Sequence, residues 1–356
     1  MKTFMGYDDD FYIQNALANS RFDEGGLLKH HVPRLQIEST ISEFIDAPLV
    51  KRYLVITGAR GTGKSTAVAA VAKGKSSVIH LKVKSEEDDF YSLLSAEIGT
   101  DKDTKINIIA AKLRSAHKID PVTGKILVPT IVLDVNMKSE QSKLVKDAAI
   151  VAKELAVDGA VANVIIILSD NNAAFGLPVD HSRRDLICID DFTKEEAREY
   201  GDKIGLLTGE KNATARNVVF DVIGTRPSTL AAVAKEQHNL DEYVRRTLVG
   251  ADSEMRSFVY FGYGDLIKML NISDRGVPMA SATAANKEFY RVLVAQNSIA
   301  TKLHVVLYSQ CDTKYYFQSQ AFQYVARHPH WEENSFSDLV KLEEARENKV
   351  KRENYP

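Results

Sequence analysis

The chain has 356 residues, of which 44% are hydrophobic and 26% charged, and its formal net charge is −2. This length predicts two or three domains with the composition of a soluble globular protein. The near-neutral charge gives no basic field for attracting nucleic acid. No stretch of the sequence reaches about 18 apolar residues, so we expect no membrane span. The acidic N-terminus MKTFMGYDDDFY is unlike a signal peptide, so we expect a cytoplasmic or nuclear protein.

The first half of the chain alternates between two kinds of pattern. Five short apolar runs are rich in Val and Ile, at 52–58, 77–83, 130–135, 163–170 and 185–191. Most lack a period of two, which is typical of parallel strands covered on both faces. Helical patterns lie between the runs, as at 65–74 and 139–157. After an N-terminal segment, 1–30, this alternation predicts a doubly wound α/β domain over 31–191.

Beyond the last of these runs the strand signal fades. Thr193 is followed three residues later by Glu196, which predicts a capping box and the first helix of a small helical domain over 192–250. Over 255–335, helical patterns precede two short alternating runs joined by a turn-like CDT, which predict a hairpin, and then another helix. The tail, 336–356, is charged and is expected to fray.

The most specific motif is GARGTGKS at 58–65, which fits G-x-x-x-x-G-K-[ST] between an apolar strand and a helix. Gly58 and Gly63 let the backbone fold so that the loop amides face phosphate oxygens. Lys64 would reach the β- and γ-phosphates, the Ser65 hydroxyl would ligate Mg²⁺, and the helix N-terminus adds positive charge. The alternative is a chance Gly-rich turn. The predicted nucleotide-binding residues are Gly58, Ala59, Arg60, Gly61, Thr62, Gly63, Lys64, Ser65 and Thr66.

A second stretch, TIVLDVN at 130–136, places Asp134 at the end of a buried strand. There it would hold Mg²⁺ through a water molecule, although a strand-end aspartate can also simply cap a turn. In many ATP-hydrolysing proteins a glutamate that activates the attacking water follows this aspartate. Val135 and Asn136 stand in its place here.

Three explanations for the missing acid stay open. The protein hydrolyses ATP very slowly and uses the bound state as a switch; or an acid arrives from elsewhere, such as Glu140 or the EEDD run at 86–89; or the amide of Asn136 or Asn171 orients the water. The EEDD run has a simpler interpretation as a solvated helix start.

Together these motifs resemble the AAA+ class of P-loop ATPases, and specifically their signalling branch, the STAND and archaeal-ATPase-like proteins, over about residues 30–330. The resemblance implies that HVPRLQIESTI, with Arg34 and Glu38 at the usual positions and Pro33 in place of a common glycine, lies against the adenine. It also implies that Ser169, in LSDNN, is a polar sensor residue near the γ-phosphate.

Further residues follow from the same resemblance. GTRPSTL at 224–230 resembles the lid motif, which implies that Pro227 packs at the nucleotide and that Arg226 is a sensor arginine. Arg183 and Arg184 precede the fifth strand, where many AAA+ proteins place an arginine finger, although a solvated basic pair is the alternative. The predicted hairpin and the helix after it resemble a winged helix.

The sequence therefore predicts a protein that binds ATP, ADP and Mg²⁺. It would be a weak ATPase that acts as a switch through a protein partner or self-assembly. The alternative is a DNA-binding ATPase, since origin-binding relatives also join an AAA+ core to a winged helix. Residues 255–356 carry thirteen Lys and Arg against eleven Asp and Glu, which is too balanced for a strong phosphate-binding face.

Overall fold

A computed structural model describes most of the chain. The described residues are 26, 28–75, 77–83, 85, 89–101, 104–119, 126–135, 143–169, 177, 183–260, 277–278, 299–305, 311–317, 320–328 and 331–354. They divide into two compact units, one running from Met1 to Ile189 with Val305–Gln310, the other from Asp190 to His304 with Cys311–Pro356.

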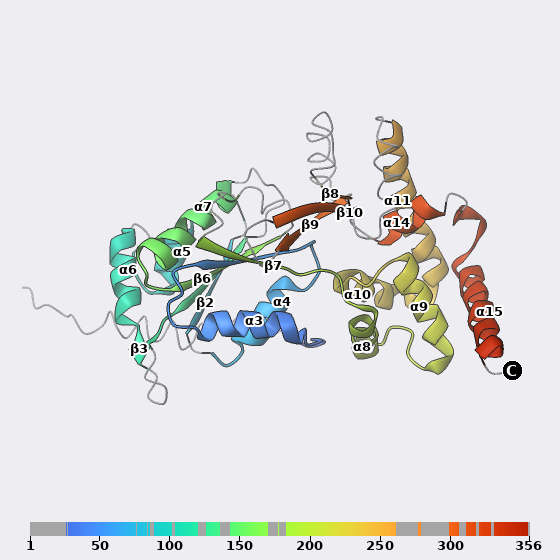
Figure 1. The fold of residues 1–356 in the computed structure, drawn as a ribbon, viewed down its shortest axis with the longest axis horizontal. Coiled ribbons are helices and arrows are strands. Elements are labelled where there is room, and N and C mark those ends of the chain that lie inside the picture. The colour runs from blue at the N-terminus through green and yellow to red at the C-terminus, as the bar shows by residue number, and fades with distance from the viewer. Residues whose placement is uncertain are drawn as a thin grey trace, which may run out of the picture. The chain divides into compact units, whose positions relative to one another are not determined.

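The first unit is built on a five-stranded sheet, in the order β2-β5-β6-β1-β7 (Figure 1). All neighbouring strands are parallel. The strands are β1 (Tyr53–Thr57), β2 (Val78–Val83), β5 (Thr130–Val135), β6 (Asn163–Leu168) and β7 (Arg184–Cys188). Every residue of β1, β5 and β6 is buried, because helices cover both faces of the sheet. The five apolar runs thus form the predicted parallel sheet, and the α/β fold class is confirmed.

Helices cover the two faces of this sheet (Figure 1). On one face lie α3 (Leu35–Asp46) and α4 (Lys64–Ala72), whose apolar side chains pack against Leu54, Val132 and Ile165 of the sheet. On the other face lie α5 and α7. The other elements that the structure describes in this unit are α5 (Phe90–Glu97), α6 (Ile106–Ser115), β3 (Lys118–Ile119), β4 (Ile126–Leu127), α7 (Lys143–Ala152) and the π-helical turn η1 (Lys153–Asp158).

The second unit is mainly helical. Its described helices are α8 (Lys194–Ile204), η4 (Glu210–Asn212), α9 (Ala213–Val222), α10 (Pro227–Glu236), η5 (Gln237–Asn239), α11 (Leu240–Tyr260), α14 (Gln320–Arg327), η8 (Trp331–Glu333) and α15 (Phe336–Asn354). The predicted capping box is present: Thr193 Oγ1 accepts from Glu196 N at 3.1 Å, and Thr193 N donates to Glu196 Oε2 at 2.8 Å. None of the described helices is both long and apolar enough to cross a membrane.

One hydrophobic core joins segments that the sequence assigned to different domains. Val219 of α9 and Leu230 of α10 share this core with Val325 of α14 and with Trp331 and Phe336. The long helix α11 also runs through the expected boundary between 250 and 255. The tail forms helix α15, whose first turns pack Phe336 and Leu339 into the same core, while most of its charge lies after residue 340.

The two runs of the predicted hairpin overlap two of three short strands. They form a sheet in the order β8-β10-β9, with β8 (Val277–Pro278) antiparallel to β10 (Cys311–Phe317) and β9 (Ile299–Val305) on the other side of β10. The two alternating runs are therefore neighbouring strands. Most of the helical patterns expected between 261 and 298 lie outside the described residues, so the winged helix stays a prediction.

Candidate functional site

The GARGTGKS loop connects the carboxyl end of β1 to the first residue of α4. Gly58 has a φ of +150°, and a Cβ built on it would lie 2.1 Å from the carbonyl oxygen of Ile189, which follows the neighbouring strand β7. Gly63, with a φ of +93°, is the N-cap of α4. The two glycines of the motif are therefore required by close backbone approach and by left-handed geometry.

Side chains hold the loop in shape by donating to its carbonyl groups. Lys64 Nζ donates to Gly58 O and Ala59 O, both at 2.8 Å, and to Ser169 O at 3.3 Å. Thr62 Oγ1 donates to Ala59 O at 3.0 Å. The amides of the first turn of α4, at residues 64–66, have no acceptor within the helix, as at any helix start. This arrangement suits an anion bound in front of the helix.

Ser65 and Asp134 come together from different elements, as the motifs predicted. Ser65 Oγ, in the first turn of α4, donates to Asp134 Oδ2 on β5 at 3.1 Å. Within the described part of the chain, no three His, Cys, Asp or Glu side chains gather to hold a metal ion. A hydroxyl with a single carboxylate is the kind of partial oxygen site that Mg²⁺ uses when phosphates supply further ligands.

This region also contains the buried charges. Among the residues that the structure describes, the charged side chains in the buried class are Arg34, Lys64 and Asp134, each at most 8% exposed. Arg34 reaches the loop itself, since its Nη1 donates to Thr62 O at 3.4 Å. Burying a charge destabilises a fold by several kcal/mol unless partners compensate, so three buried charges in one place indicate a functional site.

The segment ahead of the loop is tied to it through Arg34 and Glu38. The Arg34 amide donates to Glu38 Oε1 at 2.8 Å, and His31 Nε2 lies 3.1 Å from the same oxygen. Arg34 is therefore both the N-cap residue of α3 and a hydrogen-bond donor to the loop 58–65. The resemblance placed these two residues beside the adenine, and the structure brings Arg34 to the adjoining loop.

Sequence reasoning missed His80. It lies on β2, and its Nε2 is 3.5 Å from Asp134 Oδ2. Nothing in the run SVIHLKV marks this histidine, because its importance depends on β2 lying next to β5 in the sheet.

The structure does not bring the candidate arginine fingers to this site. Arg183 and Arg184 lie at the amino end of β7, whereas the P-loop and Asp134 lie at the carboxyl ends of parallel strands, on the opposite edge of the sheet. Arg183 Nη1 lies 3.8 Å from Asp158 Oδ1 at that edge. Both residues are partly buried at that edge, so a role as fingers at this site would require a second copy.

The other predicted residues are located as follows. Arg226 and Pro227 belong to the second unit, where they are the N-cap and first residue of α10. Arg226 Nε donates to Asp191 Oδ1 at 2.7 Å, and its Nη2 donates to Asp191 Oδ2 at 3.3 Å. Asp89, the last acid of the EEDD run, caps α5 by accepting from Ser92 N at 2.9 Å, as a helix start predicts. The remaining candidates for the missing acid or amide lie outside the described residues, at 86–88, 136, 140 and 171.

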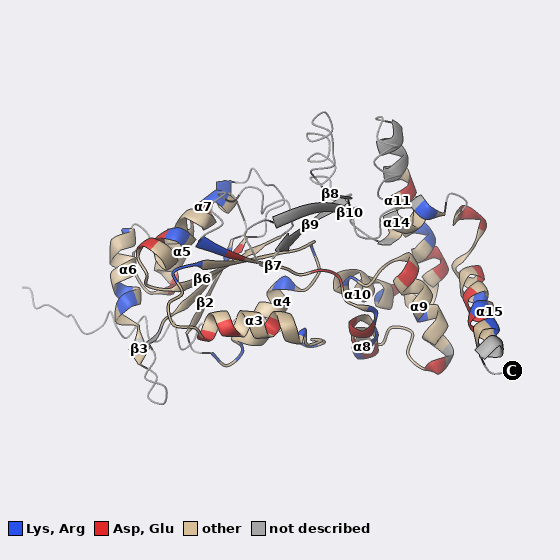
Figure 2. Ribbon diagram, viewed as in Figure 1, with Lys and Arg blue, Asp and Glu red and all other residues tan. Residues whose placement is uncertain are grey.

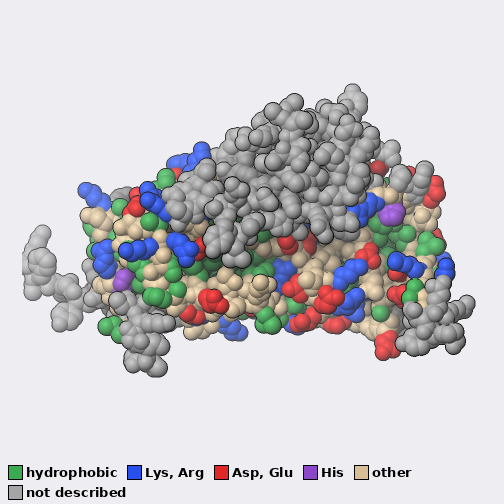
Figure 3. Space-filling view, in the orientation of Figure 1, with side chains coloured by type: hydrophobic (Ala, Val, Ile, Leu, Met, Phe, Trp, Pro, Cys, Tyr) green, Lys and Arg blue, Asp and Glu red, His purple; other side chains and the backbone are tan. Residues whose placement is uncertain are grey.

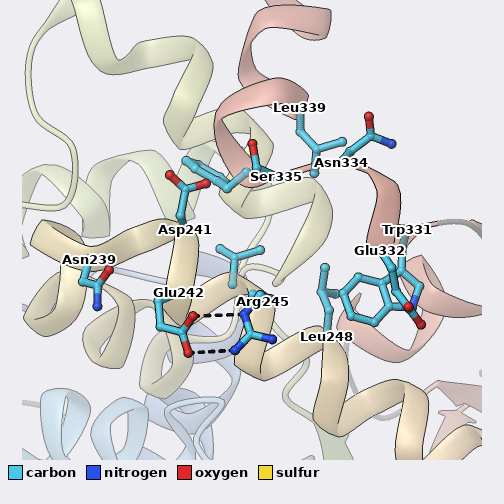
Figure 4. Close-up of a pocket in the computed structure, with 12 residues that line it drawn as sticks. Asn239, Asp241, Glu242, Arg245, Leu248, Trp331, Glu332, Asn334, Ser335 and Leu339 are labelled. Carbon is cyan, nitrogen blue, oxygen red and sulfur yellow. Dashed lines mark hydrogen bonds and ion pairs between the residues drawn. The ribbon is translucent and has the colours of Figure 1, made fainter.

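A pocket of about 320 Å³ lies in the second unit, between α11 and the segment 331–339 (Figure 4). Arg245 is the one cation among its described lining residues, and it donates to Glu242 through Nε at 3.0 Å and Nη2 at 3.1 Å. These hydrogen bonds lower the pKa of Glu242 and raise that of Arg245. With three carboxylates and one engaged guanidinium in its lining, this pocket does not suit an anionic nucleotide.

The charges of the described helices do not form a basic face. Lys and Arg alternate with Asp and Glu along α15 (Figure 2), where Lys341 pairs with Asp338 and Arg346 with Glu343. Both signs are also interspersed on the visible face of the molecule (Figure 3). No model of a known protein family matches this chain, and no curated protein matches it in sequence. The functional inference therefore depends on the site itself.

Proposed function

We propose that the protein binds MgATP at the loop 58–65 and acts as a nucleotide-dependent switch with slow hydrolysis. The observation that carries this proposal is the meeting of the buried charges Arg34, Lys64 and Asp134 at a glycine-dependent turn between a parallel strand and a helix. In open parallel sheets, ligands bind at the carboxyl ends of the strands, which is where this turn lies.

Each residue has a physical role in the proposal. The backbone amides at the start of α4 donate to phosphate oxygens, and Lys64 exchanges its loop carbonyl acceptors for the β- and γ-phosphates. Ser65 and Asp134 hold Mg²⁺, the carboxylate acting through a water molecule. When bound, the ion neutralises charge that develops on the phosphates. Ser169, whose carbonyl accepts from Lys64 Nζ at 3.3 Å, would lie beside the γ-phosphate.

Slow turnover follows from the residue after Asp134. Val135, which is fully buried at the end of β5, has an aliphatic side chain. It therefore supplies no base to a water molecule in front of the loop 58–65. Phosphoryl transfer depends mostly on positioning and charge neutralisation, so the loss of a base slows the reaction without abolishing it. A long-lived ATP state of this kind suits signalling through a protein partner or self-assembly.

Isothermal titration calorimetry tests the proposal with Lys64→Ala. We expect ATP affinity to fall about 100-fold or more, because the variant loses charge-assisted hydrogen bonds worth roughly 3 kcal/mol. Lys73→Ala is the matched control, since Lys73 is an exposed lysine at the other end of α4. A folded Lys64→Ala protein with the affinity of the wild type would refute nucleotide binding at this loop.

A further inference from the structure

The geometry points to His80 as the positioning residue that orients the Asp134 carboxylate on the metal side of the nucleotide site. This inference rests on the proposed function. His80 would act through Asp134 and would not touch the nucleotide.

The register of the sheet determines how His80 approaches Asp134. In the parallel pairing of β2 with β5, His80 is opposite Val132 and Lys82 is opposite Asp134. His80 therefore starts two residues, or about 7 Å, nearer the amino end of the sheet than the carboxylate. Side chains two residues apart share a face, and Val132 packs in the core beneath α3 and α4. His80 thus reaches Asp134 from within the sheet, on the face that α4 covers.

Two contacts converge on one oxygen of the carboxylate. Ser65 Oγ lies 3.1 Å from Asp134 Oδ2, and His80 Nε2 lies 3.5 Å from the same atom. Oδ1 accepts no hydrogen bond from the part of the chain that the structure describes. Ser65 Oγ on α4 thus donates to Oδ2, while His80 Nε2 on β2 approaches the same atom without a hydrogen bond between the two, and Oδ1 would be left for a metal-bound water.

The burial of the two side chains supports a polar role for His80. The side chain of His80 is 14% exposed and that of Asp134 is 11% exposed. Val78, two residues before His80 and therefore on the same face of β2, is a buried aliphatic residue, so an apolar side chain would fit this face as well. An imidazole beside a buried carboxylate partly compensates the desolvation of that carboxylate. Polar groups behind a metal-holding carboxylate typically change metal affinity 10- to 100-fold when they are removed.

The depth of His80 distinguishes this role from that of a catalytic base. The loop 58–63 and Ser169 follow the carboxyl ends of their strands, whereas His80 begins two residues below Asp134. A base must reach the attacking water within hydrogen-bond distance. From below Asp134, the ring contacts the carboxylate and not the space in front of the P-loop.

Calorimetric titration of ATP in Mg²⁺ and in EDTA measures the gain in affinity that the metal provides. We expect His80→Leu to reduce this gain 10- to 100-fold and to leave the affinity in EDTA within about twofold of the wild type. His80→Gln keeps an N–H donor at similar reach and should retain most of the gain, whereas the shorter His80→Asn should lose it. In an Asp134→Ala background, His80→Leu should have no further effect.

The matched control is His117→Leu, because His117 is also partly buried but lies 2.8 Å from Val161 O, away from the site. A wild type that binds no nucleotide would overturn the proposed function and this inference together. A wild type that binds MgATP, with the same metal-dependent gain in His80→Leu, would overturn this inference alone. If His80→Leu does not fold, equal gains in His80→Gln and His80→Asn overturn it. An effect of His80→Leu that persists without Asp134 would contradict action through the carboxylate.

Discussion

The two units treat charged side chains differently. In the first unit, Lys64 and Asp134 are buried beside the P-loop at 7% and 8% exposure. In the described part of the second unit, no charged residue is buried to this extent, and several ion pairs lie at the surface. The side chains of Arg245 and Glu242, for example, are 63% and 40% exposed.

This difference indicates where function is to be sought. An exposed ion pair contributes about 0–1 kcal/mol and is easily formed between residues one helical turn apart. A buried charge destabilises the folded state by several kcal/mol unless it is compensated, so a fold retains it where it has a task. In the pocket of the second unit, the one cation among the lining residues that the structure describes, Arg245, is paired with Glu242 on the same helix. The first unit instead holds buried charged side chains around the loop 58–65.

The largest effect is expected at Gly58. Gly58→Ala would put a Cβ 2.1 Å from the Ile189 carbonyl oxygen, so the strand-to-helix turn must distort. We expect a loss of about 4 kcal/mol or more in the free energy of unfolding, measured by urea denaturation. Gly74→Ala is the control, because Gly74 also has a positive φ but no atom within 4 Å of a Cβ. Equal losses in the two variants would show that the close approach is unimportant.

Val135→Glu tests the cost of the missing acid. Val135 is fully buried, so a carboxylate there should lower the free energy of unfolding by roughly 3 kcal/mol even if it reaches the attacking water. Thermal denaturation gives the stability, and phosphate release gives turnover. Wild-type turnover of about 1 per second or faster would mean that a base is already present, and the slow-switch proposal should then be dropped.

Asp134→Ala separates metal binding from nucleotide binding. We expect the gain in ATP affinity on adding Mg²⁺ to fall about tenfold or more, because the ion loses the carboxylate that holds its water. Affinity in EDTA should change little. An unchanged metal-dependent gain would mean that Asp134 only accepts the hydrogen bond from Ser65 Oγ.

A smaller effect is expected from Thr193→Ala at the start of α8. Removing the capping hydroxyl leaves the Glu196 amide without its acceptor, which should reduce stability by about 1 kcal/mol. ATP affinity should not change. Thr193→Ser keeps the hydroxyl and serves as the control; a loss as large as that in Thr193→Ala would show that the methyl group matters instead.

The smallest effect is expected at the surface pair of the second unit. Glu242→Gln should leave the unfolding midpoint at neutral pH and the affinity for ATP unchanged within error. The hydrogen bond from Arg245 lowers the pKa of Glu242, so any stability from this pair is present above the pKa of an unfolded glutamate. It is lost as pH falls through the lowered pKa. A clear destabilisation at pH 7 would blur the contrast between the two units.

The sequence by itself determined the elements whose signals are local. Three features depend only on neighbouring residues and form where they were predicted. They are the glycine-rich loop before Lys64, the apolar strands and the capping box at Thr193. The pairing of Ser65 with Asp134 also followed, because the loop before Ser65 leaves the carboxyl end of one predicted parallel strand and Asp134 lies near the carboxyl end of another.

Tertiary structure alone decided which distant residues meet. Strand order places β2 beside β5 and so brings His80 to Asp134. The shared core of the second unit likewise brings Phe336 and Leu339, at the start of α15, against helices that are distant in the sequence. Strand order and core packing depend on which buried surfaces fit together across the whole chain, and no local pattern of residue types carries that information.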